Sequence, residues 1–231
     1  MDSVVEENDV LVLPEDKAHH MQKVLRARTG DTFEVVDATQ GLYIAELRDG
    51  RKANVLCELE VLGENPAELR LYQAVPKGKH MDFVVEKATE LGVDCIVPLV
   101  SEHSVVRLDR EGDKVGRWRR LSEAAARQSL QLRVPEVLEP VAFGEAVNNP
   151  AGSKILLANE PGVPPLEEVI GGGLTSLFVG PEGGWSEPEI QFAVENGSTV
   201  AQLGPYRLRS ETAGVVAVAR AVAAQERLHS K

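Results

Sequence analysis

The sequence of 231 residues contains 25 Lys and Arg against 36 Asp and Glu, and its formal net charge of -11 argues against a general nucleic-acid coat protein. Its 43% hydrophobic content is enough for a packed core, in one large domain or two modest ones. The acidic N-terminus and the short apolar runs fit neither a signal peptide nor a membrane helix, so we expect a cytoplasmic protein that binds no membrane.

The first 67 residues have the pattern of a small β-barrel domain. Short runs with partial alternation predict strands at 10–13, 32–36, 42–47 and 53–59, separated by turn signals such as Gly30-Asp31. One helix is expected over 14–27. Several short strands at close spacing are typical of a small barrel.

The pattern changes near residue 68, where strands begin to alternate with helices. Such alternation predicts an α/β domain with a parallel sheet over residues 68–231. The expected strands are 69–75, 95–100, 155–158, 174–179 and 200–203, and the expected helices are 81–91, 118–130, 187–196 and 211–228.

Positive charge is concentrated in one segment of the second domain. Residues 1–70 contain 8 Lys and Arg against 15 Asp and Glu, whereas residues 107–133 contain eight basic and four acidic side chains. This distribution of charge has two interpretations: the basic side chains lie on a solvated helix face, or they form a surface that binds RNA phosphates.

The segment Gly180-Pro181-Glu182-Gly183-Gly184 lies between a predicted buried strand and a helix start with the capping-box spacing of Ser186 and Glu189. Glycines let a ligand approach the main chain closely, and open parallel sheets bind ligands beyond the carboxyl ends of their strands. The segment matches neither a dinucleotide-binding motif nor a P-loop, and Glu182 would repel a phosphate. The sequence leaves two interpretations open: the segment binds a ligand that has no phosphate, or it is a turn that binds no ligand.

A second Gly-Pro turn, Gly204-Pro205, follows the strand at 200–203, and a helix starts near Ser210 or Thr212. Two such turns after consecutive strands would place two backbone-rich loops side by side. Arg207, Arg209 and Glu211 add charge next to this expected pocket, with ordinary surface ion pairing as the alternative.

Six short blocks follow one another along nearly the whole chain. They are His19–Arg26 with Gly30-Asp31, Glu86–Val93 with Pro98-Leu99, Ser101–Val105, Ala124–Ser129 with Arg133–Glu136, Gly180–Gly184, and Leu208–Ala213. Together they resemble the RsmE family of the SPOUT superfamily, whose members methylate N3 of a uridine in small-subunit (16S) ribosomal RNA.

The resemblance implies S-adenosylmethionine as the methyl donor. It implies a PUA-like β-barrel that binds RNA over residues 1–67, and a SPOUT methyltransferase domain with a deep trefoil knot over residues 68–231. It also implies a homodimer and, as partner, 16S rRNA or the small ribosomal subunit. The donor carries a sulfonium and no phosphate, in agreement with Glu182 in the expected pocket. No metal is expected, because the five histidines lack metal-ligand spacing.

The resemblance and the loop positions give three sets of candidate site residues. For the N3 proton we expect Arg209 or Glu211, as a base or as a cation that stabilises the uridine anion. The expected RNA contacts are His20, Lys23 and Arg26 on one helix face, together with Lys77, Lys79, Arg107, Arg127, Gln128 and Arg133. The expected donor-binding residues are Leu157, Gly180, Pro181, Glu182, Gly183, Gly184, Leu203, Gly204, Leu208, Ser210, Thr212 and Ala213.

Several single residues have a structural interpretation. The spacing of Lys87 and Glu90 predicts an ion pair within a helix. Trp118 and Trp185 are expected to pack in the core or to form pocket walls. His103 and its neighbour Glu102 lack a third group for acid–base catalysis, so a loop role is expected for them.

The chain departs from the family pattern at His103, where Arg is common, and at Leu130-Gln131, where Gly-Arg is common. Both positions concern RNA contacts more than donor binding. Two other functions stay open, a catalytically silent RNA-binding module and an α/β enzyme acting on a small metabolite. The intact segments 180–184 and 208–213 favour a working donor site, and the barrel with the basic segment favours an RNA substrate.

Overall fold

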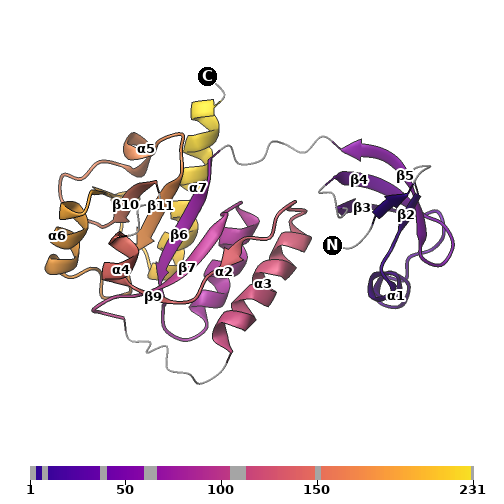
Figure 1. Cartoon of the computed structure of the whole chain (residues 1–231), viewed down its shortest axis with the longest axis horizontal. Helices are drawn as coiled ribbons and strands as arrows, with labels where there is room; N and C mark the ends of the chain where they lie inside the picture. Colours follow the sequence, from indigo (N-terminus) through magenta and orange to yellow (C-terminus); the bar gives the residue numbers. More distant parts are fainter. Residues whose placement is uncertain are drawn as a thin grey trace. The chain divides into compact units, whose positions relative to one another are not determined.

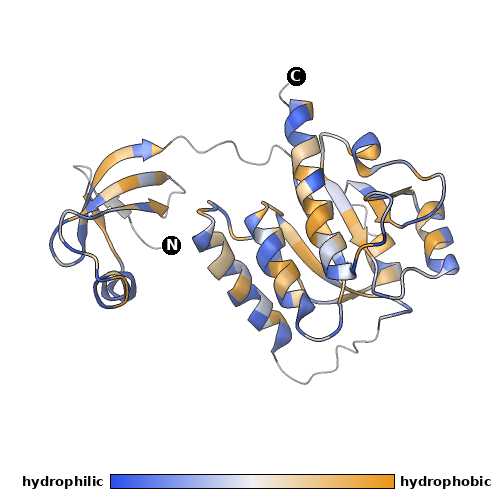
Figure 2. Cartoon of the chain, turned by 180° about the vertical axis from the view of Figure 1, so that it is seen from behind, coloured by the Kyte–Doolittle hydropathy of each residue, from blue (hydrophilic) through white to orange (hydrophobic). Residues whose placement is uncertain are grey.

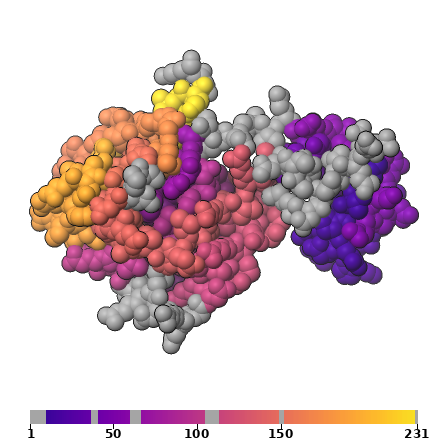
Figure 3. All heavy atoms as spheres, in the orientation of Figure 1, coloured from indigo at the N-terminus to yellow at the C-terminus, as the bar shows by residue number. Residues whose placement is uncertain are grey.

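The computed structural model describes residues 4–6, 10–36, 41–59, 67–104, 113–148 and 152–229 (Figures 1 and 3). The chain divides into two compact units. One consists of Met1–Glu64 with Leu130–Arg133, and the other of Asn65–Ser129 with Val134–Lys231. The predicted domain boundary between residues 67 and 68 stays a prediction.

The N-terminal unit contains a five-stranded sheet in the order β1-β2-β5-β4-β3 and one helix, α1. All its strand pairs are antiparallel. Leu11, Ala45 and Ala53 are fully buried between the strands and form its small core. The elements are β1 (Val4–Glu6), β2 (Val10–Val12), α1 (Glu15–Lys23), β3 (Thr32–Val36), β4 (Leu42–Leu47) and β5 (Lys52–Leu59).

Helix α1 is shorter than the predicted helix over 14–27, because it ends at Lys23. The backbone then reverses, Ala27 N–H donates to Met21 O at 2.9 Å, and Ala27 packs against the small apolar cluster beneath α1. Arg26 lies in this reversal with a φ of 55°. The expectation that Arg26 shares one helix face with His20 and Lys23 is therefore wrong.

The C-terminal unit is built on a seven-stranded sheet in the order β12-β10-β11-β6-β7-β8, with β9 also paired to β7. Every strand pair in it is parallel, as the alternation of strands and helices predicts. From β6 the chain first adds β7 and β8 on one side and later fills the other side, so the strand order reverses between β6 and β11. Ligands bind outside the carboxyl ends of strands at such a reversal. The strands are β6 (Leu69–Ala74), β7 (Cys95–Val100), β8 (Glu136–Val137), β9 (Val141–Ala142), β10 (Ser153–Leu157), β11 (Thr175–Val179) and β12 (Ser198–Ala201).

Helices cover both faces of this sheet. Helices α2 (His80–Glu90), α3 (Lys114–Gln128) and α7 (Ser210–His229) form one layer, seen in front of the sheet in Figure 2, where each carries both hydrophobic and hydrophilic residues. Helices α4 (Phe143–Asn148) and α6 (Glu187–Glu195) cover the opposite face, and α5 (Leu166–Val169) packs against α7. No helix in the described part of the chain is long and apolar enough to span a membrane.

Local signals explain where two of these helices begin. Helix α3 begins at Lys114, earlier than the predicted start at 118, because Asp113 caps it by accepting a hydrogen bond from Gly116 N at 2.8 Å. The capping box of Ser186 and Glu189 is confirmed at the start of α6. The predicted ion pair is also confirmed, with Lys87 Nζ 2.7 Å from Glu90 Oε1. The short elements β1, β8, β9, α4 and α5 have no counterpart in the predicted pattern.

Aromatic packing fills the centre of the C-terminal unit on the α4 and α6 side. Phe178 of β11 is fully buried. Its ring stacks on Tyr72 with a centroid distance of 4.5 Å and meets Phe143 edge-on at 6.4 Å. Burial of the Tyr72 hydroxyl raises its pKa above the usual range. This cluster therefore holds β6, β11 and α4 together.

Replacing the ring at the middle of this cluster should destabilise the C-terminal unit. We expect Phe178→Ala to lower the free energy of unfolding by about 3–5 kcal/mol, because a buried ring is lost and a cavity remains. Urea unfolding followed by tryptophan fluorescence measures this unit, since Trp118 and Trp185 both belong to it. The control is Phe83→Ala, whose side chain is 46% exposed. Equal losses for the two variants would contradict this account of the core.

Candidate functional site

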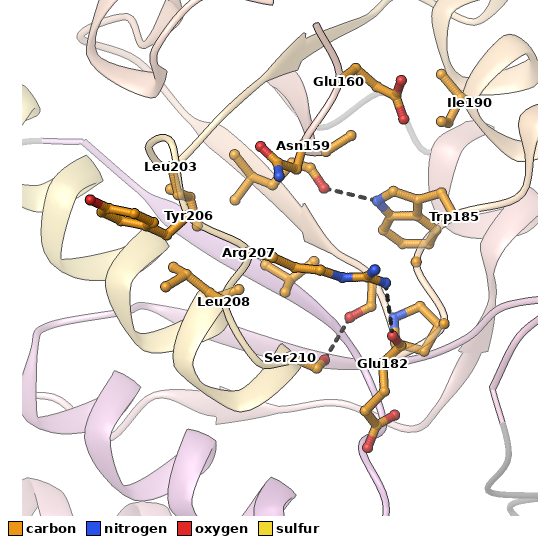
Figure 4. A pocket seen from close by; sticks show the side chains of 18 of the residues that line it. Asn159, Glu160, Glu182, Trp185, Ile190, Leu203, Tyr206, Arg207, Leu208 and Ser210 are labelled. Atoms are coloured by element: carbon orange, nitrogen blue, oxygen red, sulfur yellow. Dashed lines mark hydrogen bonds between the residues drawn. The ribbon is translucent and has the colours of Figure 1, made fainter.

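A cavity of about 320 Å³ lies at the carboxyl ends of β10, β11 and β12, within the size range of small-molecule sites. Three segments form most of it: residues 157–160 at the end of β10, residues 179–185 at the end of β11, and residues 203–210, which lead into α7 (Figure 4). The two Gly-Pro turns thus lie on one cavity, as their positions after parallel strands predict.

Eleven of the twelve predicted donor-binding residues line this cavity, and Thr212, in the first turn of α7, does not. The prediction missed the residues after β10, although that strand was expected, because only the position of β10 beside β11 brings them to the cavity. Trp185 was expected in the core or in a pocket wall, and it lines the cavity. The lining residues outside the predicted set are Ala158, Asn159, Glu160, Val179, Trp185, Ile190, Tyr206 and Arg207.

The glycines of the first turn allow close packing around the cavity. Gly184 has a φ of 76°, a conformation that favours glycine. A β-carbon at Gly180 would lie 3.1 Å from the Trp185 ring, so this ring rests directly on the turn. Trp185 Nε1 donates to Leu157 O at 3.0 Å, which joins the β11 turn to the end of β10 (Figure 4).

A chain of hydrogen bonds joins the turn to α7 and to the sheet. Ser210 Oγ donates to Gly180 O at 2.6 Å, and the fully buried Gln73 donates through Nε2 to Ser210 Oγ at 2.9 Å. A β-carbon at residue 214 would lie 2.2 Å from Gln73 Oε1, so glycine at that position leaves room for the amide. Residues far apart in sequence are thereby held on one side of the cavity.

Glu182 has a structural contact that spacing did not predict. Its Oε1 accepts a hydrogen bond from Lys77 N at 2.9 Å, in the loop between β6 and α2. Figure 4 shows this carboxylate turned away from Asn159 and Glu160 at the opposite end of the cavity. Arg207 reaches over the same turn, with Nη2 3.4 Å from Glu182 O. The Glu182 side chain therefore braces the β6–α2 loop against the turn.

The loop after β7 is fastened to the same turn. Glu189, whose exposed fraction is 9%, accepts hydrogen bonds from Glu102 N and Ser186 N, each at 2.9 Å. His103 Nδ1 lies 3.1 Å from Gly184 O. His103 thus has the loop contact expected of it.

Neither predicted catalytic residue lines the cavity. Arg209 is exposed, whereas Glu211 is buried in the first turn of α7. Glu211 Oε1 lies 3.5 Å from Nδ1 of His80, the first residue of α2. A carboxylate and an imidazole at this distance can share or transfer a proton.

The sequence matches the RNA methyltransferase domain family over residues 63–222 and the RNA methyltransferase PUA domain family over residues 13–55. The ribosomal RNA small subunit methyltransferase E of Synechocystis sp. is 33% identical over 218 residues, which cover 87% of this chain and 69% of that protein. The enzyme of the same name from Aquifex aeolicus is 33% identical over 211 residues, which cover 90% and 91%.

The chain belongs to the ribosomal RNA small subunit methyltransferase E family. A crystal structure of the Neisseria gonorrhoeae member of this family, bound to S-adenosyl methionine, is similar to this RNA methyltransferase with a TM-score of 0.78. The two sequences are 30% identical, and the match covers 95% of this chain and 94% of that one.

The described RNA-contact candidates of this methyltransferase are all exposed, and Arg107 lies outside the described residues. Part of the positive charge between residues 107 and 133 is neutralised by ion pairs. Arg117, Arg119 and Arg120 pair with Asp82, Glu139 and Asp113. The exposed candidates are His20, Lys23, Arg26, Lys77, Lys79, Arg127, Gln128 and Arg133.

The described part of the chain contains no group of three or more His, Cys, Asp or Glu side chains placed to hold a metal ion. The two cysteines are free, and burial of Cys95 raises its pKa to about 11.

Two serines of the C-terminal unit should respond differently to substitution. Ser210→Ala leaves Gly180 O without this donor and leaves Gln73 Nε2 with Ala74 O as its remaining acceptor, so we expect the free energy of unfolding to fall by about 1–3 kcal/mol. Ser198 is the matched control, because its hydroxyl is buried without a hydrogen-bond partner in the described structure. Ser198→Ala should leave stability unchanged or raise it in the same urea titration. A larger loss at Ser198 than at Ser210 would overturn the role given to the Ser210 hydroxyl.

Proposed function

We propose that this chain transfers a methyl group from S-adenosylmethionine to N3 of a uridine in small-subunit ribosomal RNA. The observation that carries the proposal is the cavity formed by two Gly-Pro turns at the carboxyl ends of parallel strands. This cavity belongs to a chain of the ribosomal RNA small subunit methyltransferase E family, and one similar structure has S-adenosyl methionine bound.

The chemistry of the cavity suits this donor. At the glycine turn, the flat adenine ring of the donor can come close to the main chain. The apolar walls of the cavity are formed by Trp185, Leu203 and Leu208. Asn159 and Glu160 add a polar end, whose carboxylate suits a cationic ligand. We therefore propose the eleven predicted residues that line the cavity, with Asn159, Glu160 and Trp185, as the donor-binding residues. The bound donor would supply an electrophilic methyl group, and these residues would hold it in position.

The RNA must place its uridine next to this cavity with N3 unpaired. We propose that the exposed Lys77 and Lys79 contact phosphates on one side, while Arg127, Gln128 and Arg133 make further contacts. We propose further RNA contacts on the PUA domain, at His20, Lys23 and Arg26. Arg209, next to Ser210 of the cavity, is our candidate for the cation that stabilises the developing uridine anion.

The family resemblance supports three further proposals. We propose a homodimer, a trefoil knot in the C-terminal unit, and a cytoplasmic protein whose partner is 16S rRNA or the small ribosomal subunit. Each alternative function makes its own prediction. A silent module would bind RNA without transferring a methyl group. An enzyme acting on a small metabolite would not need a PUA domain.

Donor binding and methyl transfer test the proposal together. A thermal shift with S-adenosylmethionine, and none with NAD, is the expected first result. Incubation with the donor and unmodified small ribosomal subunits should then create a primer-extension stop, because a methyl group at N3 blocks base pairing. Absence of a thermal shift with the donor would contradict the proposed function. A shift without transfer to naked RNA or to subunits would favour the silent module.

Removing two exposed cations should weaken RNA binding alone. For Lys79→Ala with Arg127→Ala we expect lower RNA affinity and a slope of log affinity against log salt that is shallower by about 0.7–0.9 for each lost phosphate contact. The matched control changes Arg119 and Arg120, which already pair with Glu139 and Asp113. Donor affinity should not change in either variant. An equal effect of both pairs on the salt slope would argue against this assignment.

A further inference from the structure

His80 and Glu211 form a pair at the start of two helices. Nδ1 of His80 lies 3.5 Å from Oε1 of Glu211. The side chain of Glu211 is 11% exposed, whereas that of His80 is 53% exposed. The carboxylate is thus enclosed by the protein, while the imidazole can meet a large substrate from outside.

The pair lies where the strand order of the sheet reverses. Strands β6 and β11 are parallel neighbours. The loop after β6 leads to His80 at the start of α2, and the loop after β11 contains the glycine turn of the cavity. Two hydrogen bonds fasten these segments together, from Lys77 N to Glu182 Oε1 and from Ser210 Oγ to Gly180 O. Because Lys77 precedes His80 by three residues and Ser210 adjoins Glu211, both partners are tied to the cavity wall.

We propose that His80 is the catalytic proton acceptor for N3 of the target uridine, and that Glu211 is its positioning residue. This inference rests on the proposed function. With its Nδ1 proton directed to the Glu211 carboxylate, the neutral imidazole keeps a lone pair on Nε2. A separation of 3.5 Å is long for a hydrogen bond, and such catalytic contacts tighten when the substrate binds.

The step is balanced in atoms and charge. The N3–H bond of uridine breaks and its proton passes to Nε2 of His80. The N3 electron pair forms a bond to the methyl carbon, and the carbon–sulfur bond breaks with its electron pair going to sulfur. The sulfonium becomes a neutral thioether, and the imidazolium formed on His80 is stabilised by the Glu211 carboxylate. The proton then leaves to solvent from the exposed imidazole.

An alternative role for His80 is that of a cation for an RNA phosphate, beside the exposed Lys77 and Lys79. A phosphate contact needs positive charge and would tolerate arginine. A proton acceptor needs a lone pair near neutral pH, which arginine lacks. The two roles therefore predict opposite behaviour of His80→Arg.

The test is the single-turnover rate of methyl transfer to small ribosomal subunits at saturating donor and RNA. We expect His80→Ala to slow transfer by about 10²–10⁴-fold, the usual contribution of a general base, and added imidazole to restore part of the rate. His80→Arg should stay slow. His229→Ala is the matched control, since His229 lies at the other end of α7, and imidazole should not change its rate. An unchanged donor-induced thermal shift will show that each variant is folded.

The positioning role of Glu211 is tested by separate variants. Glu211→Gln should slow transfer without changing the affinity for donor or RNA, and Glu211→Asp should recover part of the rate. A near wild-type rate for His80→Ala, or an active His80→Arg together with no response to imidazole, would overturn the proposal. Failure of the wild-type chain itself to methylate subunits would instead overturn the proposed function.

Discussion

The hydrogen-bonded chain from Gln73 through Ser210 to Gly180 is the interaction on which the site depends. It joins the end of β6, the first residue of α7 and the turn after β11, which are three segments far apart in the sequence. The bond between Gln73 and Ser210 is buried, and the bond from Ser210 to Gly180 is partly buried at the cavity wall. Losing the Ser210 hydroxyl would leave Gly180 O without this donor, while Gln73 Nε2 would keep its bond to Ala74 O. The cavity wall is therefore set by long-range packing of the sheet.

Three acidic side chains near this cavity, Glu182, Glu189 and Glu211, have specific structural contacts. Glu182 and Glu189 both accept hydrogen bonds from backbone N–H groups of neighbouring loops. Glu211 faces His80. Glu189 and Glu211 are buried, whereas Glu182, Lys77 and Lys79 are exposed. We expect the other acidic residues to limit non-specific binding to RNA.

Much of this architecture was predictable from the sequence because it depends on local signals. The alternation of strand and helix segments predicted the parallel sheet and its longer helices, and the Gly-Pro turns after strands predicted two loops of the cavity. The six blocks also indicated the family. Arg26 was placed wrongly, since the end of α1 depends on how Ala27 packs. Short elements such as β8 and β9 carry too few residues to show a period.

The contacts of the acidic residues could not be predicted, because they join residues that are distant in the chain. Nothing in the spacing of Glu182 points to Lys77, and nothing near Glu211 points to His80. The same holds for Asn159 and Glu160, which reach the cavity only because β10 lies beside β11. Sheet order, and not sequence distance, decides which side chains meet at the carboxyl edge.

Nucleoside analysis by mass spectrometry is the most direct test of the account. Small ribosomal subunits that lack the modification would be incubated with this chain and S-adenosylmethionine, and their RNA digested to nucleosides. The account predicts that 3-methyluridine forms, at one position of the small-subunit RNA and only when the donor is present. A methyl group on another atom or base, or none at all with donor bound, would contradict it.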